Sequence, residues 1–192
     1  MTTEEIILSN LRGNVRETYD MPTLSFGKLQ YPDPVGAFIT AASTVAGASV
    51  IEAREGDDIN ELIRKAYPEA KIIASNLPGV KADRNPDEVS SPQELDGTDV
   101  SVVAGTVGCA ENACVWIPQT MRQRAVCFIC EYLVIILHRK DIVSNMHEAY
   151  MRIEMPEMGF GTFISGPSKT ADIEQALVYG AQSFCGVTII LV

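Results

Sequence analysis

Apolar and polar residues alternate with two different periods along most of the chain. In the segments 36–47, 59–66 and 141–154, apolar residues recur on one face of a helix. A fourth helix is predicted at 170–181, behind a plausible N-cap residue. Short apolar runs rich in β-branched residues predict strands between these helices. The predicted strands are 48–53, 71–75, 99–105, 113–117, 124–129, 132–137, 161–165 and 186–192.

This alternation of strands and helices predicts an α/β fold. Apolar, β-branched strands that alternate with helices are typical of a mostly parallel sheet covered on both faces. In the middle of the chain, strands follow one another without an intervening helix. We therefore expect an antiparallel or irregular insertion in the sheet at this point.

Residues 1–30 lack the regular pattern. They are polar, with Gly13, Pro22 and Gly27 as interruptions. They predict an N-terminal arm that packs on a neighbour or stays mobile, and we assign residues 31–192 to one domain. The first ten residues are acidic where a signal peptide needs a basic region followed by an apolar run, so we expect a cytoplasmic protein.

The net charge of the chain argues against some classes of binding partner. The 192 residues include 15 basic and 25 acidic side chains, which gives a net charge of −10. Such a protein has no electrostatic reason to approach nucleic acid or an anionic membrane. The longest apolar stretch, 125–138, is interrupted by Glu131 and is shorter than the ~20 residues of a spanning helix. We expect no nucleic-acid binding and no membrane span.

Four of the five cysteines are spaced C-x4-C-x12-C-x2-C. A four-thiolate metal site needs all four sulfurs about 2.3 Å from one metal ion. Cys127 and Cys130 lie in an apolar, strand-like run, and in an extended strand residues three apart point to opposite faces. Between Cys109 and Cys114 no tight turn is evident except around Asn112. Free cysteine packs as a small hydrophobe, so the pattern favours reduced core sulfur over a metal site.

Glu111 and Asn112 lie between two predicted strands. Strand ends build ligand sites in open α/β sheets, so Glu111 is the candidate catalytic residue and Asn112 a candidate ligand contact. A solvated turn acid is the competing interpretation. Arg124 could clamp an anionic ligand or pair with Glu111, or lie on the surface as arginine usually does.

The stretch SGPSKTADIEQALVYGA occupies residues 165–181. A strand ends here, the chain turns, and a helix is predicted to begin near Thr170, with Asp172 in its first turn. Free N–H groups and hydroxyls at such a turn suit a phosphate or carboxylate. An ordinary helix cap is the alternative. The candidate ligand-binding residues are Ser165, Gly166, Ser168, Thr170 and Asp172.

The same stretch resembles, nearly residue for residue, the C-terminal signature of the lactate-utilisation (LUD-domain) proteins of the LutC/YkgG-like family. The resemblance runs over most of residues 35–192 and is strongest at 99–117 and 159–181. It implies a three-layer α/β/α sandwich similar to the NagB/RpiA/CoA-transferase superfamily. It also implies a role in oxidising L-lactate to pyruvate beside iron–sulfur partner proteins. Short members of the family lack ferredoxin-like cysteine motifs, which agrees with core sulfur and with no cofactor on this chain.

The chain departs from the family in three places. The family's central motif reads roughly Ala-Glu-Thr-Gly-Thr, and the segment Ala110–Cys114 keeps only its alanine and glutamate. The downstream proline-and-histidine pattern is replaced by CFICEYLV, and the terminal His-Gly-Pro by Gln182-Ser183-Phe184. Arg124 falls where the family tends to have an arginine. These changes leave the expected fold intact and alter the residues that would meet a ligand.

Three functions are compatible with these patterns. The first is an accessory subunit of an L-lactate-oxidising complex. The second is an independent CoA-transferase-like enzyme, because Glu111-Asn112 resembles the Glu-Asn-Gly element whose glutamate attacks a thioester, although Ala113 replaces the glycine. The third is a ligand-binding or assembly module that uses the cleft at the sheet end. An anionic small molecule is the expected ligand.

Overall fold

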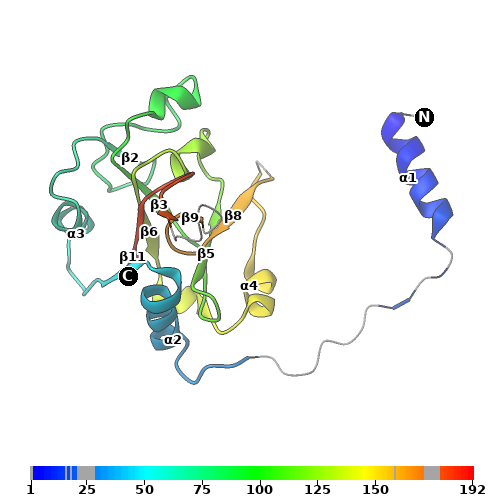
Figure 1. The fold of residues 1–192 in the computed structure, drawn as a ribbon, viewed down its shortest axis with the longest axis horizontal. Coiled ribbons are helices and arrows are strands. Elements are labelled where there is room, and N and C mark those ends of the chain that lie inside the picture. The colour runs from blue at the N-terminus through cyan, green and yellow to red at the C-terminus, as the bar shows by residue number, and fades with distance from the viewer. Residues whose placement is uncertain (1, 16, 18, 21–28, 158, 171–177) are drawn as a thin grey trace.

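The computed structural model describes residues 2–15, 17, 19–20, 29–157, 159–170 and 178–192. Its centre is a five-stranded sheet in the order β1-β11-β6-β3-β2, and every pairing within it is parallel (Figure 1). The strands are β1 (Ser49–Glu52), β2 (Ile73–Ala74), β3 (Val100–Ala104), β6 (Tyr132–Leu137) and β11 (Gly186–Leu191). The central strand β6 is almost wholly buried, which explains its uninterrupted apolar sequence.

In place of the insertion expected within the parallel sheet, the structure has a second, four-stranded sheet. Its order is β7-β4-β5-β8, with β4 paired antiparallel to β5 and β5 antiparallel to β8. The strands are β4 (Val107–Cys109), β5 (Cys114–Pro118), β7 (Ile142–Val143) and β8 (Gly161–Ile164). These strands therefore form a separate sheet beside the parallel one.

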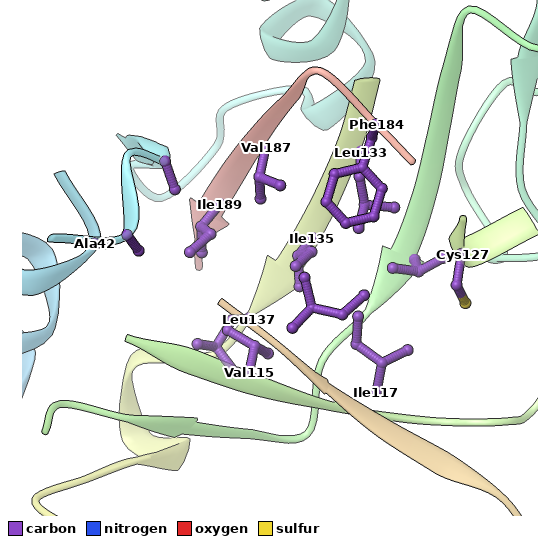
Figure 2. Close-up of a cluster of buried hydrophobic side chains, with 14 of the residues drawn as sticks. Ala42, Val115, Ile117, Cys127, Leu133, Ile135, Leu137, Phe184, Val187 and Ile189 are labelled. Carbon is purple, nitrogen blue, oxygen red and sulfur yellow. The ribbon is translucent and has the colours of Figure 1, made fainter. Parts of the chain in front are cut away.

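Helices cover both faces of the parallel sheet, which confirms the predicted α/β fold. On one face, Ile63 of α3 (Ile59–Ala66) packs with Val102 and Val134. On the other face lie α2 (Pro34–Ala41), its π-helical continuation η1 (Ala42–Ala46) and the second sheet. Figure 2 shows this face: side chains of β6 gather with those of β5 and β11 in one cluster. The labelled members are Ala42, Val115, Ile117, Cys127, Leu133, Ile135, Leu137, Phe184, Val187 and Ile189.

The strand predicted at 124–129 is wrong. Arg124–Cys127 forms a short 3-10 helix, η3, with Val126 and Cys127 buried and Phe128 partly exposed. A brief apolar run has the same composition in a strand and in a buried helical turn, so its periodicity does not separate them.

The helix predicted at 170–181 is wrong at both ends. Lys169–Thr170 (β9) pairs antiparallel with Val178–Tyr179 (β10). Thr170 therefore lies in a strand. Residues 171–177, including Asp172, lie outside the described residues. The pairing places Thr170, Val178 and Tyr179 in strands, although the local pattern favoured a helix at all three positions.

The helix predicted at 141–154 is shorter than expected. It is α4 (Met146–Arg152), and its N-cap Asn145 accepts a hydrogen bond from the Glu148 N–H. The preceding residues form β7 after a 3-10 turn, η4 (Arg139–Asp141). Another 3-10 turn, η2 (Pro92–Leu95), lies in the polar stretch between β2 and β3.

The N-terminal arm contains a helix that the sequence pattern did not predict. Thr2 and Glu5 form a reciprocal capping box at the start of α1 (Thr3–Asn14), and none of the side chains of α1 is buried. A threonine followed three residues later by glutamate is the signal that could have found it. The Asn145 amide donates to the Leu29 carbonyl at 2.8 Å, which links the end of this segment to the start of α4. Within the described ranges, no helix is long and apolar enough to cross a membrane.

The Asp99 side chain links the residues just before β2 to the start of β3. Its Oδ2 atom accepts the N–H groups of Ile72 and Lys71, each at 2.8 Å, and these bonds lower the pKa of its carboxyl. A lowered folded-state pKa stabilises the fold above the unfolded value of about 3.9, and this contribution is lost as the pH falls through the folded value.

We expect Asp99→Asn to weaken the acid dependence of stability, because the amide cannot titrate. Urea unfolding at a series of pH values from neutral to strongly acid measures this, with the arm variant Asp20→Asn as an exposed control. If Asp99→Asn loses stability in acid as steeply as the wild type, Asp99 is not one of the groups responsible.

Candidate functional site

The candidate acid lies at the tip of the β4–β5 hairpin. Glu111 and Asn112 are both exposed there, while the flanking Cys109 and Cys114 are buried. The Asn112 side chain accepts the Cys114 N–H at 3.1 Å, and Ala113 has a positive φ of 55°. A side-chain bond of this type commonly shapes a tight turn. The turn holds the carboxylate and the amide at the surface.

The Glu111 carboxylate is tied to the start of α4. Its Oε2 atom accepts the Met146 N–H at 3.0 Å, and its own N–H donates to the Ser144 carbonyl at 3.1 Å. A carboxylate at a helix start stabilises the free N–H groups there. One oxygen of Glu111 thus has a structural role.

Ser165 brings the signature segment against this turn. Its Oγ atom donates to the Asn112 carbonyl at 2.7 Å. The two residues are 53 positions apart in sequence, and the bond joins the end of β8 to the tip of the β4–β5 hairpin. Glu111, Asn112 and Ser165 therefore belong to one surface.

Gly166 packs against the end of the π-helix. Its φ is +66°, and a Cβ atom placed on it would lie 2.0 Å from the Ala46 carbonyl oxygen. The Lys169 ammonium donates to the same carbonyl and to that of Val45. Short π-helical segments are frequent at functional sites. Lys169 was absent from the predicted site, although it lies inside the signature stretch.

Ser168 uses its backbone to hold the same segment in place. Its N–H donates to the Phe184 carbonyl at 3.2 Å, and its carbonyl accepts the Gly180 N–H at 2.9 Å. These main-chain groups are therefore not the free helix-start donors that the sequence predicted. Among the predicted ligand contacts, Ser165, Gly166 and Ser168 lie together, and Thr170 follows them in β9.

Comparison with known proteins identifies the family. The sequence profile of the LUD domain matches residues 89–192, which is more than half of the chain. This chain belongs to the LUD-domain family. The matched part of this LUD protein contains the Glu111 turn and the whole signature stretch, and family membership implies a function related to lactate utilisation.

A solved structure supports the fold of this LUD protein. A DUF162 family protein from Deinococcus radiodurans superposes with a TM-score of 0.59 at 17% sequence identity. The match covers 82% of this chain and 93% of that chain. At this identity the likeness concerns the fold alone. No curated protein matches the sequence significantly.

Arg124 of the LUD protein lies away from Glu111. Glu111 precedes β5, whereas Arg124 follows the far end of that strand and stacks over the Phe160 ring, 4.6 Å from its centroid. It lines a cavity of about 500 Å³ with Pro92, Gln123, Ala125, Phe128 and Ile129. The structure does not bring Arg124 to the Glu111 turn, and the pairing considered from the sequence is not formed.

The four clustered cysteines are buried, as predicted. Cys127, however, lies in the 3-10 helix η3 and not in the strand that the sequence argument assumed. Cys127 and Cys130 lie in the main core, and burial raises the pKa of Cys127 to about 12. Cys109 and Cys114 lie in a smaller cluster and are directly opposite each other across the hairpin. The turn that joins them is at Asn112, whose side chain accepts the Cys114 N–H. In the part of the chain that is described, no group of three or more His, Cys, Asp or Glu residues could hold a metal ion.

Proposed function

We propose that this LUD protein is an accessory subunit of an L-lactate-oxidising complex and acts beside iron–sulfur partner proteins. Its family supports the lactate context. The observation that carries the proposal is the Ser165–Asn112 hydrogen bond, 2.7 Å long. This bond unites the signature stretch and the glutamate turn in one exposed surface, on which an anionic small molecule could bind.

The distribution of sulfur supports an accessory role. The four buried cysteines belong to two separate hydrophobic clusters and pack there as core residues. Iron–sulfur clusters need cysteine thiolates that converge on one centre. We therefore assign electron transfer to partner subunits and positioning or ligand binding to this chain.

The proposal is tested by anaerobic purification of the tagged protein from its native host, together with deletion of its gene. We expect co-purification of cysteine-rich iron–sulfur oxidoreductase subunits and poor growth of the deletion strain on L-lactate. Growth on another carbon source controls for general sickness. A chain that purifies alone, from a host whose growth on lactate does not need it, would contradict the proposal.

The variant Glu111→Gln separates this function from that of a CoA-transferase-like enzyme. Glutamine can still accept the Met146 N–H, so the fold and the complex are expected to persist. A nucleophilic carboxylate, in contrast, is lost entirely. Glu94→Gln is the matched control, because Glu94 also accepts a backbone N–H at a helix start, from Ser91 at 3.0 Å. Unchanged co-purification of Glu111→Gln is expected, and loss of a CoA-transfer activity in this variant alone would favour the enzyme.

A further inference from the structure

Cys109 and Cys114 are paired across the hairpin that presents Glu111. They are directly opposite each other in the β4–β5 register, so their side chains lie on the same face of the hairpin, and both belong to one buried cluster. Opposite residues of antiparallel strands have Cα atoms about 4.5–5.5 Å apart. A disulfide accepts Cα separations of roughly 4.4–6.8 Å. The backbone of the hairpin is therefore compatible with a disulfide without rearrangement.

The environment gives the two sulfur atoms different roles. The Cys114 thiol and the backbone N–H groups of Glu111 and Asn112 lower the pKa of Cys109. The Cys109 sulfur and burial raise the pKa of Cys114. Cys109 is thus the better thiolate and Cys114 the thiol beside it. A thiolate next to a second thiol is the arrangement of a nucleophilic and a resolving cysteine.

We propose that Cys109 and Cys114 form a redox-active dithiol that a hydroperoxide oxidises to a disulfide. The Cys109 thiolate attacks the O–O bond, forms a sulfenic acid and releases hydroxide. The Cys114 sulfur then attacks the Cys109 sulfur, and the S–O bond breaks. The departing hydroxide takes the Cys114 thiol proton and leaves as water. Two electrons pass from the thiols to the peroxide, and a thiol reductant reverses the reaction.

Met146 connects this dithiol to the candidate site. Its Sδ atom accepts the Cys114 thiol at 3.4 Å, and its N–H donates to Glu111. Formation of the disulfide removes the thiol proton from the contact with Met146 and closes a covalent ring around the Glu111–Asn112 turn. The oxidised hairpin would therefore hold that turn more rigidly.

Access to the dithiol runs through the turn. Cys109 is completely buried and Cys114 is 4% exposed, whereas the neighbouring Glu111 and Asn112 are exposed. Hydrogen peroxide is small enough to enter when the turn opens locally. Larger oxidants are expected to react more slowly at this site than at the exposed Cys185.

The test is peptide mapping of the whole protein after treatment with hydrogen peroxide. The reaction is quenched, free thiols are alkylated in denaturant, and trypsin releases the two cysteine pairs separately. Peptide 85–122 carries Cys109 and Cys114, and peptide 125–139 carries Cys127 and Cys130. We expect peptide 85–122 to lose two hydrogens and take no alkyl group, and peptide 125–139 to take two. Dithiothreitol should restore both alkylation sites in peptide 85–122.

Two variants sharpen the test. Cys114→Ala should leave Cys109 as a sulfenic acid that dimedone traps. Cys127→Ala/Cys130→Ala should form the disulfide as the wild type does, because that pair lies in another cluster. The proposal is overturned if wild-type peptide 85–122 remains fully alkylated at a peroxide concentration that oxidises Cys185. The result does not depend on lactate metabolism, so it is independent of the proposed function.

Discussion

Gly166→Ala is expected to lower the free energy of unfolding by about 3 kcal/mol or more. A left-handed backbone costs a residue with a Cβ atom roughly 1–2 kcal/mol, and overpacking adds about 1–3 kcal/mol. The new Cβ atom would lie 2.0 Å from the oxygen and 2.7 Å from the carbon of the Ala46 carbonyl. Both neighbours are backbone, so the strain cannot be relieved by a side-chain rotation. Urea unfolding measures the loss.

Gly159→Ala is the matched control for this prediction. Gly159 has the same φ of +66°, but among the described residues, its own chain neighbours aside, no atom lies within 4 Å of the position its Cβ would take. It should therefore show only the backbone cost of roughly 1–2 kcal/mol. Equal losses of unfolding free energy in the two variants would mean that the contact with the π-helix does not exclude a side chain at position 166.

Phe38→Ala is expected to destabilise the protein by about 3–5 kcal/mol, the usual cost of removing a large buried aromatic side chain. Phe38 is completely buried, and it fixes α2 against the parallel sheet and the second sheet. Its ring also lies 3.3 Å from the position of a Cβ on Gly108 in β4. Loss of this ring leaves a cavity where the three elements meet.

Phe128→Ala serves as the control for Phe38→Ala. Phe128 is 37% exposed at the end of η3, so we expect a distinctly smaller loss, because the site can fill with water. Thermal and urea unfolding of both variants measure the difference. A loss at Phe38 no larger than the loss at Phe128 would contradict the position of α2 in the core.

The structure gives the signature stretch a structural explanation as well as a functional one. Gly166 permits close contact with Ala46, and Lys169 binds carbonyls at the end of the π-helix. Ser165 reaches the Glu111 turn. The segment therefore connects α2 to the hairpin of the second sheet. A ligand bound at the Glu111 turn would contact a surface whose position is fixed by contacts among the signature stretch, the end of the π-helix and the hairpin.

Local sequence patterns located the strands of the parallel sheet correctly. Residues 132–137 form a continuous apolar run, and 186–192 are apolar except for Thr188; they became β6 and its neighbour β11. The apolar face of 59–66 became α3, with Ile63 buried. These elements are recognisable because a buried parallel strand and an amphipathic helix each impose a periodicity on the residues themselves.

Tertiary contacts decided the elements that the sequence misplaced. The segment 124–129 is equally apolar as strand or helical turn, and the packing of Val126 and Cys127 selected η3. Thr170 carries a capping signal, yet Lys169–Thr170 pairs with Val178–Tyr179. A backbone pairing between two short segments leaves no regular pattern in either segment alone, so propensity did not predict it.

The sequence by itself determined the α/β class, the burial of the four cysteines and the two stretches that form the candidate site. Those properties follow from the hydrophobicity of single residues and from short motifs. Only the tertiary structure decided that Ser165 meets Asn112, that Arg124 lies apart from Glu111, and that Cys109 is opposite Cys114. Each of these relations depends on strand register and on how the second sheet lies against the first. Register is fixed by the burial of whole faces, which no local stretch of residues contains.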